Sequence, residues 1–397
     1  MSNIKKISIK FAKIGMCMAE SVKDAHDKIL LKKGMYITSK KQIVEFLDNG
    51  IKEIVIDLAK SLIEFTPTKE EEKITKDKVK KEFDNPEEYL EDLKIEIEKA
   101  EIFYNSSKRI INEIMHDIRS GKKLKESAVN DSVQQVIKSI SKNYQALLSM
   151  TSLKTFDEYT YNHSVNVMVI TLSIAQHLNY STEKLLTIGK GALLHDIGKA
   201  KIPLDIINKP GKLTDTEYKL IKQHPSFGRE ICVKDDLQNQ IINDIVLHHH
   251  EDFEGTGYPH KLKRSEISKH VAIVSISDYY DALTTIRSYK RKINPAEAIS
   301  MIFGQANKKF DRRLVNLFIK KVGIYPVGSI VKLKSKRIAM VVGFSQNNLL
   351  VPIVKILIDS DKKVNKFRET VILDNEEDYI LEINPDIHLN LRVKDVI

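Results

Sequence analysis

The chain has 397 residues, a length that allows two or three domains with separate cores. Its 42% hydrophobic and 30% charged residues are ordinary for a soluble globular protein. The net charge of +10 comes mainly from lysine, since only 11 of the 64 basic residues are arginine, and the lysines are scattered among glutamates as on solvated helix faces. This charge is compatible with a phosphate-bearing ligand. No basic stripe is interleaved with aromatic residues, so we expect no nucleic-acid polymer as a partner.

Three features of the chain bear on its location in the cell. No run of 18 apolar residues occurs, so we expect no transmembrane helix. The N-terminal stretch MSNIKKISIK lacks the apolar core of a secretory signal peptide. Cys17 and Cys232 are far apart and match no metal or redox spacing, which fits a reducing compartment. Together these features predict a cytoplasmic protein.

Residues 1–65 have the pattern of a small α+β domain. The stretches IKKISIKFAKIG and IKEIVID alternate in the manner of strands. Between them, SKKQIVEFLDNG predicts a short helix that is closed by Asn49 and Gly50.

Residues 66–140 consist of charged helical segments and predict a connector. Apolar residues three to four positions apart form one seam along its main helix, and they are Leu90, Leu93, Ile97, Ala100 and Tyr104. The seam can pack on the next domain, or it can pack on a second copy of the chain and make a homodimer. The sequence does not choose between these two arrangements.

Residues 141–326 are strongly helical and carry most of the side chains that could bind a metal or take part in catalysis. Beyond them the pattern changes to the β-type runs VKLKSKRIAMVVGF, LLVPIVKILI, TVILD and DYILEI, which turn residues separate. Residues 327–397 therefore predict a small all-β domain. The chain contains no glycine-rich phosphate loop, no dinucleotide fingerprint and no internal repeat.

Polar residues interrupt the apolar helices of this region at several positions. His163 shares a helix face with Val167 and Ile170 and so points inward. Taken alone, His163 can be an ordinary core histidine, as can His177 on much the same stripe.

His195 and Asp196 follow an apolar helix, and Gly198 suits the end of that helix. Two adjacent buried polar groups are costly unless they are paired or bound to a metal. Consecutive helical side chains diverge by about 100°, which fits a carboxylate between two metals with its neighbouring imidazole on one of them. A surface Asp-His pair at a frayed helix end is the alternative.

Further polar residues follow along the chain. His224 precedes a proline, which limits its conformation. The run from His248 to His250 lies directly before a loop with two glycines and a proline. Asp278 and Asp281 are three residues apart and share a helix face, so one can bind a metal while the other orients it or handles a proton. Two solvated aspartates are the alternative.

Together these side chains indicate metal chemistry. Imidazole suits zinc, iron, manganese and similar ions, and a mixed His/Asp set can hold two of them. Two metals about 3.5–4 Å apart can share an activated hydroxide and stabilise the attacking and leaving oxygens of phosphoester cleavage. The set therefore predicts a metal-dependent phosphohydrolase.

The motifs HDIGK, HHEDFEGTGYP and SDYYDALTTIRSYK, in this order, closely resemble the HD-GYP family, a subgroup of the HD phosphohydrolases that hydrolyses cyclic di-GMP. The resemblance covers residues 141–326 and includes IPLDIINKPGKLTDTEYKLIKQHP and FDRRLV. It implies a multidomain protein whose catalytic domain is an all-α HD-type helical bundle between the α+β and all-β domains. The N-terminal stretch ILLKKGMYITSKKQIVEFLDNGIKEIVID is similar to a small domain often found ahead of HD-GYP domains. The C-terminal part is similar to tails of related proteins, which suits a structural or interaction role.

The resemblance implies two divalent metal ions, iron or manganese. The matching ligands are His163, His195, Asp196, His224, His249, His250 and Asp278. Asp196 would bridge the metals, and His248 would be only a neighbour of the ligands. Asp281 would support catalysis from behind a ligand rather than bind metal.

The same resemblance implies how the substrate is held. The matching residues are Lys199, Gly257, Tyr258, Pro259, Arg287 and Lys290. Lys199 would contact the scissile phosphate and offset its charge, while Arg287 and Lys290 would hold the substrate phosphates. Gly257, Tyr258 and Pro259 form the signature loop of the family, and Tyr258 would contact a base or sugar of the dinucleotide.

The sequence also departs from the family pattern. Some members carry a glutamate, and with it a third metal, where this chain has Tyr159. Glu158 is adjacent but lies about 100° round the helix, so we expect a two-metal site. Ser288 and Lys261 stand where proline and glycine are common, which affects loop stiffness and affinity but removes no ligand.

The implied activity is hydrolysis of cyclic di-GMP to linear pGpG, and to GMP after a second cut, through a hydroxide that bridges two metals. Two alternatives stay open. A general HD-type nucleotide phosphohydrolase would share HDIGK but has no use for the GYP loop with Arg287 and Lys290. A catalytically weak module that binds cyclic di-GMP or a protein partner is the other, although degenerate members lose metal ligands that this chain keeps. Protein partners of the flanking domains can coexist with catalysis.

Overall fold

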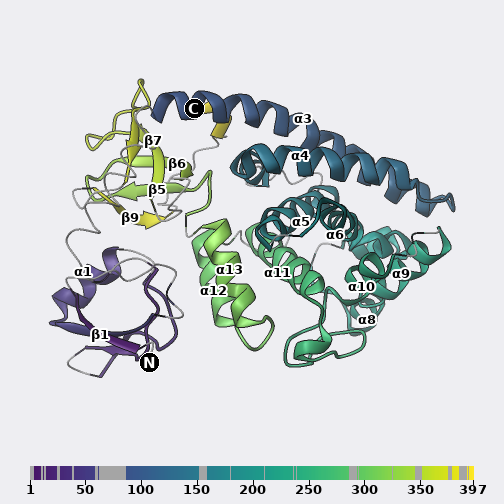
Figure 1. Cartoon of the computed structure of the whole chain (residues 1–397), viewed down its shortest axis with the longest axis horizontal. Helices are drawn as coiled ribbons and strands as arrows, with labels where there is room; N and C mark the ends of the chain where they lie inside the picture. Colours follow the sequence, from purple (N-terminus) through teal and green to yellow (C-terminus); the bar gives the residue numbers. More distant parts are fainter. Residues whose placement is uncertain are drawn as a thin grey trace. The chain divides into compact units, whose positions relative to one another are not determined.

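The computed structural model of the chain divides into two compact units, Met1–Glu91 with Val322–Ile397 and Asp92–Lys321 (Figure 1). The residues described are 4–9, 12, 15–24, 27–37, 40–58, 61, 86–151, 159–178, 180–209, 211–235, 237, 239–285, 293, 295–323, 325–344, 351–373, 378–383, 391 and 393–397. No helix among these residues combines the length and the apolar character needed to cross a membrane.

The N-terminal part is a small α+β fold, which confirms the prediction. Its elements are β1 (Ile4–Ser8), β2 (Val22–Lys23), β3 (Ile29–Leu31), α1 (Lys40–Asp48) and β4 (Glu53–Asp57). β1 pairs antiparallel with β4, and β2 pairs antiparallel with β3. Ile7, Phe46 and Ile56 belong to one buried core, so alternate strand residues and the apolar face of α1 pack together as the periodicity predicts.

The C-terminal part is an antiparallel sheet of five strands, which confirms the all-β prediction. Its strands are β5 (Ile330–Leu333), β6 (Ile338–Phe344), β7 (Pro352–Ile358), β8 (Thr370–Ile372) and β9 (Ile380–Ile383). Their order in the sheet is β8-β7-β6-β5-β9. The central strand β6 is buried along its whole length, which explains its continuous apolar run.

The second unit is a bundle of helices, as predicted. Its α-helices are α3 (Pro86–Arg119, in this unit from Asp92 onward), α4 (Glu126–Thr151), α5 (Tyr159–Ala175), α6 (Thr182–Leu194), α7 (Leu204–Ile207), α8 (Asp215–Ile221), α9 (His224–Lys234), α10 (Gln240–His248), α11 (Lys269–Thr284), α12 (Pro295–Gly304) and α13 (Arg312–Val322, in this unit up to Lys321). Short 3-10 turns are η3 (Gln176–Leu178), η4 (Ile197–Lys201) and η5 (Arg264–Glu266).

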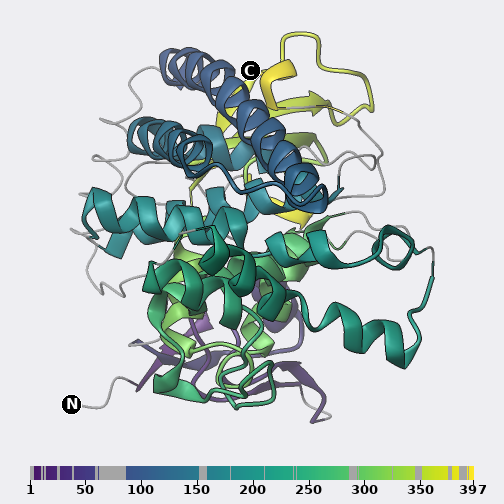
Figure 2. The same cartoon turned by 90° about the vertical axis from the view of Figure 1, so that its right-hand side faces the viewer.

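Helix α5 lies in the middle of this bundle and packs against α4, α6 and α11. Every residue of α5 from Asn162 to Ala175 is buried, so its few polar side chains must find partners inside the protein. Figures 1 and 2 show α3 and α4 side by side as a layer next to this group. Ser132 of α4 donates a hydrogen bond to Ser107 of α3 over 2.7 Å, which ties the layer together.

The connector predicted from the sequence is largely part of this unit. Its seam residues are buried within the single chain, and the compact unit begins at Asp92. The domain limit expected near residue 141 falls inside α4, close to a kink at Asn143 (φ −152°, ψ 99°). The domain limits given by the sequence therefore stay a prediction.

Helix α6 leads directly into the candidate site. Ser181 caps its start by accepting a hydrogen bond from the Lys184 N–H. The helix ends at Leu194, so the expectation that Gly198 closes it is wrong. Gly198 lies in η4, where an added Cβ would lie 1.9 Å from the carbonyl oxygen of His224. Its missing side chain is what lets α9 approach η4.

Candidate metal centre

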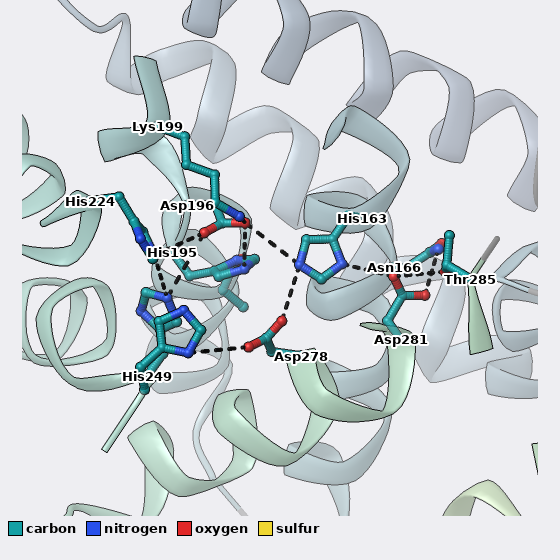
Figure 3. A network of polar contacts seen from close by, with 12 residues as sticks. His163, Asn166, His195, Asp196, Lys199, His224, His249, Asp278, Asp281 and Thr285 are labelled. Carbon is teal, nitrogen blue, oxygen red and sulfur yellow. Dashed lines mark hydrogen bonds and ion pairs between the residues drawn. The ribbon is translucent and has the colours of Figure 1, made fainter. Parts of the chain in front are cut away.

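The centre of the site is Asp196, which follows α6 between His195 and η4. His195 and Asp196 are 1% and 3% exposed, so their polar atoms are withdrawn from water. The two carboxylate oxygens of Asp196 face two different sets of histidines (Figure 3). Buried polar groups of this kind are stable only with polar partners or bound cations.

The first set contains His163 from α5 and His195. Their Nε2 atoms lie 3.6 Å and 3.4 Å from Oδ2 of Asp196. The possible ligand atoms of these three residues all lie within 4.8 Å of one another. Helical segments distant in sequence therefore meet in one group that can hold a cation.

The second set contains histidines from α9 and from the end of α10. Nε2 of His224 lies 3.2 Å from Oδ1 of Asp196, and Nε2 of His249 lies 4.0 Å from the same oxygen. With His250 these residues form a second group whose possible ligand atoms also lie within 4.8 Å of one another. Asp196 is common to both groups.

Asp278 of α11 lies between the two sets. Its Oδ1 is 3.1 Å from Nε2 of His163, and its Oδ2 is 3.8 Å from Nδ1 of His250. The carboxylate thus reaches one histidine of each set, although its atoms fall outside the two tight groups.

The imidazole rings are oriented by what their second nitrogen contacts. Nδ1 of His195, His224 and His249 donates to backbone carbonyls of Ala192, Ile221 and Val246 over 2.8, 2.8 and 3.0 Å. In the neutral ring this leaves Nε2 as a lone pair that points into the site. Carboxylate and carbonyl partners of this kind fix metal-binding histidines in proteins.

The Nε2 lone pairs of these rings point toward one another, and no hydrogen-bond donor of the described residues lies between them. This arrangement fits bound cations. Nε2 of His224 and Nε2 of His249 face each other at 3.1 Å, although both rings already donate through Nδ1. Nε2 of His195 is buried and has no hydrogen-bond partner among the described residues. A divalent cation placed among these acceptors would satisfy them, so the residues present fit a metal centre.

The charges of the site favour an ionised carboxylate at Asp196 and neutral imidazoles at His249 and His250, whereas His163 favours its protonated form. Burial opposes ionisation of Asp196, but Lys199 and His195 hold the pKa of its carboxyl well below the usual value. Burial lowers the pKa of His250 to about 3 and that of His249 far below its normal range. Burial also acts to lower the pKa of His163, but Asp278 and Asp281 raise it to about 9.

Lys199 reaches the site from η4, one turn after Asp196. Its Nζ donates to Oδ2 of Asp196 over 2.5 Å, and its side chain is 24% exposed. It therefore brings a positive charge to the partly exposed edge of the site, next to the Asp196 carboxylate.

The signature loop follows His250 directly and is fixed to it. The ring of Tyr258 stacks on the ring of His250 at 4.8 Å, and the Tyr258 N–H donates to the His250 carbonyl over 3.2 Å. Nζ of Lys222 lies 5.0 Å from the centre of the Tyr258 ring. An added Cβ at Gly257 would lie 2.4–2.5 Å from backbone atoms of residues 250–252, so only glycine allows this close fold. The Tyr258–Pro259 bond is cis.

Glu251 holds the loop from inside, and the sequence analysis missed it. Its carboxylate is 1% exposed and accepts hydrogen bonds from the N–H groups of His260 (2.6 Å) and Leu262 (3.0 Å). A carboxylate directly after two predicted ligand histidines was the available signal. Asn166, three residues after His163 on the same helix, was missed as well. It donates to Asp281 over 2.9 Å.

A family model described as HD domain matches residues 96–314, more than half of the chain. A cyclic di-GMP phosphodiesterase of Pseudomonas aeruginosa is 36% identical over 302 residues, 76% of this chain and 73% of that protein. The chain belongs to the HD-GYP family of HD-domain phosphodiesterases. A second model, a domain of unknown function called DUF3391, matches residues 4–129 and so precedes and overlaps the HD domain.

Other relatives of this HD-GYP protein match shorter stretches. A cyclic di-GMP phosphodiesterase of Borreliella burgdorferi is 31% identical over 213 residues, 53% of this chain and 55% of that protein. A 3′3′-cGAMP-specific phosphodiesterase of Vibrio cholerae is 34% identical over 128 residues, 32% of this chain and 24% of that protein.

The HD-GYP structure brings most of the predicted site residues together. The seven predicted ligands, Lys199 and the loop residues Gly257 to Pro259 surround Asp196 or follow His250 directly. Arg287 and Lys290 lie outside the described residues, as do Glu158 and the side chain of Tyr159. Asp281 lies behind His163, where its Oδ2 accepts from Nδ1 over 2.8 Å.

His248 and His177, which the sequence also brought into question, lie outside both groups of this HD-GYP protein. His248 contacts Asp244 over 2.7 Å and His260 over 2.9 Å. His177 contacts the Ser173 carbonyl over 2.9 Å. That neither residue binds a metal stays a prediction.

Proposed function

We propose that this protein is a cyclic di-GMP phosphodiesterase that works with two divalent cations. The observation that supports this proposal most strongly is that two groups of histidines share one buried carboxylate, Asp196, beside the loop that contains Tyr258. The relatives from Pseudomonas aeruginosa and Borreliella burgdorferi, both named cyclic di-GMP phosphodiesterases, support the choice of substrate.

The first group would hold one cation and the second group the other. The residues of the first are His163, His195 and Asp196, and those of the second are Asp196, His224, His249 and His250. Asp278, within 3.8 Å of a histidine of each group, completes the set between them. We assign iron or manganese, which suit mixed His/Asp ligation. Divalent cations in such a site supply Lewis-acid activation of water and of the phosphate oxygens.

The remaining tasks belong to side chains of the chain itself. The Lys199 ammonium, at the exposed edge of the cluster, would take up charge that develops on the scissile phosphate. Tyr258 would contact a base or sugar, and Arg287 and Lys290 would hold the phosphates. Asp281 would keep the proton on Nδ1 of His163, so that Nε2 stays available to a cation.

Addition of water to one phosphodiester bond of cyclic di-GMP gives linear pGpG, and cleavage of the second bond gives GMP. We propose pGpG as the first product. A cytoplasmic location is part of the proposal, because Cys17 and Cys232 are both free thiols. Dimerisation and protein partners of the flanking domains are further proposals that nothing in the site depends on.

Anaerobic purification with measurement of iron and manganese per chain tests the cation content. Chromatography of the products from cyclic di-GMP, with 3′3′-cGAMP as a parallel substrate, tests the activity. We expect about two cations per chain and release of pGpG. Absence of turnover with either metal would favour the binding-module alternative, and preference for 3′3′-cGAMP would overturn the substrate.

The variant Asp196→Ala tests the shared carboxylate directly. Because both groups depend on this residue, we expect it to lose at least one cation and all measurable turnover. A variant that keeps both cations and its activity would refute the bridging role.

A further inference from the structure

A chain of buried hydrogen bonds leads from helix α3 to the candidate ligand His163. The Tyr104 hydroxyl donates to Oδ1 of Asn166 over 2.6 Å, and Nδ2 of Asn166 donates to Oδ1 of Asp281 over 2.9 Å. Oδ2 of Asp281 then accepts from Nδ1 of His163 over 2.8 Å. These four side chains are 6%, 1%, 0% and 3% exposed. Figure 3 shows the last three of them in line behind the site.

We propose that Tyr104 and Asn166 are positioning residues that set the orientation of His163 toward a bound cation. This inference rests on the proposed metal centre. It assigns to helix α3, which lies outside the motifs of the HD-GYP pattern, a direct part in cation binding.

The chemistry of each group fixes the direction of the chain. An ionised carboxylate only accepts hydrogen bonds, so Asp281 must face the amide nitrogen of Asn166 and not its oxygen. The amide oxygen of Asn166 is thereby turned toward α3, where the Tyr104 hydroxyl donates to it. With one oxygen of Asp281 held by Asn166, the other accepts from His163, which keeps the proton on Nδ1 and directs Nε2 toward Asp196 and Asp278.

The contact also depends on the axial position of α3. Tyr104 belongs to the seam of α3 whose other members are apolar and buried, and Ser107, one turn later, accepts from Ser132 of α4. A polar contact in an apolar helix seam favours a single register, because any other register leaves a buried polar group unpaired. Sliding α3 by one residue would move Tyr104 by about 1.5 Å along the axis and rotate it by about 100°. The position of α3 is therefore coupled to His163.

This part of α3 lies where the two family matches overlap, since the HD-domain match begins at residue 96 and the DUF3391 match ends at residue 129. The contact consequently gives that overlapping segment a physical connection to the metal centre.

The test is the affinity of the full-length protein for Mn²⁺, measured by electron paramagnetic resonance on protein stripped with a chelator. Outer partners of metal-binding histidines typically contribute about 10- to 100-fold in affinity. We expect Asn166→Leu, which keeps the side-chain size, to weaken one of the two Mn²⁺ sites by an amount in that range. Tyr104 is one hydrogen bond further from His163 than Asn166 is, so Tyr104→Phe should weaken the same site by about three- to tenfold.

The double variant distinguishes positioning from a general loss of packing. If Tyr104 acts through Asn166, the double variant should bind Mn²⁺ no more weakly than Asn166→Leu alone, because the two changes break one chain. Tyr144→Phe on α4, a partly buried tyrosine away from the site, is the matched control and should bind Mn²⁺ as the parent does. Additive effects, or Mn²⁺ affinity unchanged by Tyr104→Phe, would overturn the proposal.

Two further outcomes keep this proposal separate from the proposed function. Mn²⁺ binding does not require turnover, so a weakened site in a protein that leaves cyclic di-GMP intact would refute the activity and retain the positioning role. Thermal melting of the stripped proteins identifies a variant that does not fold. If Asn166→Leu does not fold, the comparison of Tyr104→Phe with Tyr144→Phe decides the question.

Discussion

Replacing Gly198 by alanine should disrupt the second group of predicted ligands, which includes His224 and His249. Gly198 itself has no side chain that could bind a cation. An added Cβ would lie 1.9 Å from the His224 carbonyl oxygen and 2.4 Å from the Gly228 nitrogen. An ordinary contact is about 3.4 Å, so the first turn of α9 would have to retreat by about 1.5 Å. Both neighbours are backbone atoms, so no side-chain rotation can relieve the overlap.

That displacement is large compared with the geometry it disturbs. Nε2 of His224 lies 3.2 Å from Oδ1 of Asp196 and 3.1 Å from Nε2 of His249. A misplacement of about 1 Å in a catalytic group can cost about 100-fold in rate, so we expect Gly198→Ala to lose about one cation per chain and at least that factor in kcat/KM. Overpacking should also lower the free energy of unfolding by about 1–3 kcal/mol.

The assay compares metal content, kcat/KM and thermal unfolding for Gly198→Ala and for Gly304→Ala. Gly304 is the matched control, because its added Cβ would meet nothing within 4 Å. The control should keep both cations and gain or lose less than about 1 kcal/mol. Full metal content and full kcat/KM in Gly198→Ala would show that α9 need not lie so close to η4.

Three further predictions concern other parts of the same unit. His248→Ala should keep both cations and His249→Ala should lose one, because only His249 faces Asp196; equal losses of metal in both variants would contradict the assignment. Glu251→Ala leaves two loop N–H groups without their acceptor, so it should lower the free energy of unfolding by about 1–3 kcal/mol and raise KM more than it lowers kcat, while exposed Glu254→Ala changes neither. Burial, with Asp235 adding to it, raises the pKa of the Cys232 thiol to about 12. Its thiolate therefore forms only as the pH rises through that value, and at pH 8 mass spectrometry should find it modified by a thiol reagent roughly a thousandfold more slowly than an exposed cysteine.

The sequence was most informative where chemistry and spacing coincide. The predicted ligand histidines and aspartates lie on or beside apolar helices, and an inward-facing polar residue on such a helix needs a polar partner or a bound cation. The α+β and all-β ends were recognisable because alternation and turn residues are local signals. The supporting contacts were not recognisable in this way. Asn166 and Asp281 are 115 residues apart, and Tyr104 and Asn166 are 62 apart, so only packing of the helices reveals that they meet.

Gly198 also shows that local sequence rules cannot detect contacts between distant segments, because here such a rule gave a wrong prediction. A glycine a few residues after an apolar helix usually closes that helix, so the local signal predicts a helix end. The helix instead stops earlier, and the glycine is required by the carbonyl of His224, which comes from a different helix 26 positions later. A rule based on neighbouring residues cannot represent a requirement that arises from a distant backbone.

The two halves of the metal centre are supported in different ways. Around the second group, the backbone itself is close-packed, because Gly198 lies against α9 and Gly257 lies against residues 250–252. Backbone contacts of this kind leave little room for adjustment, so His224, His249 and the loop form a rigid frame. Around the first group, His163 is held by a series of side-chain hydrogen bonds that runs through Asp281 and Asn166 and ends on α3. A small movement of one helix can lengthen or break such a chain, whereas the backbone contacts around the second group adjust less. Any control of cation binding from outside the site should therefore act on His163.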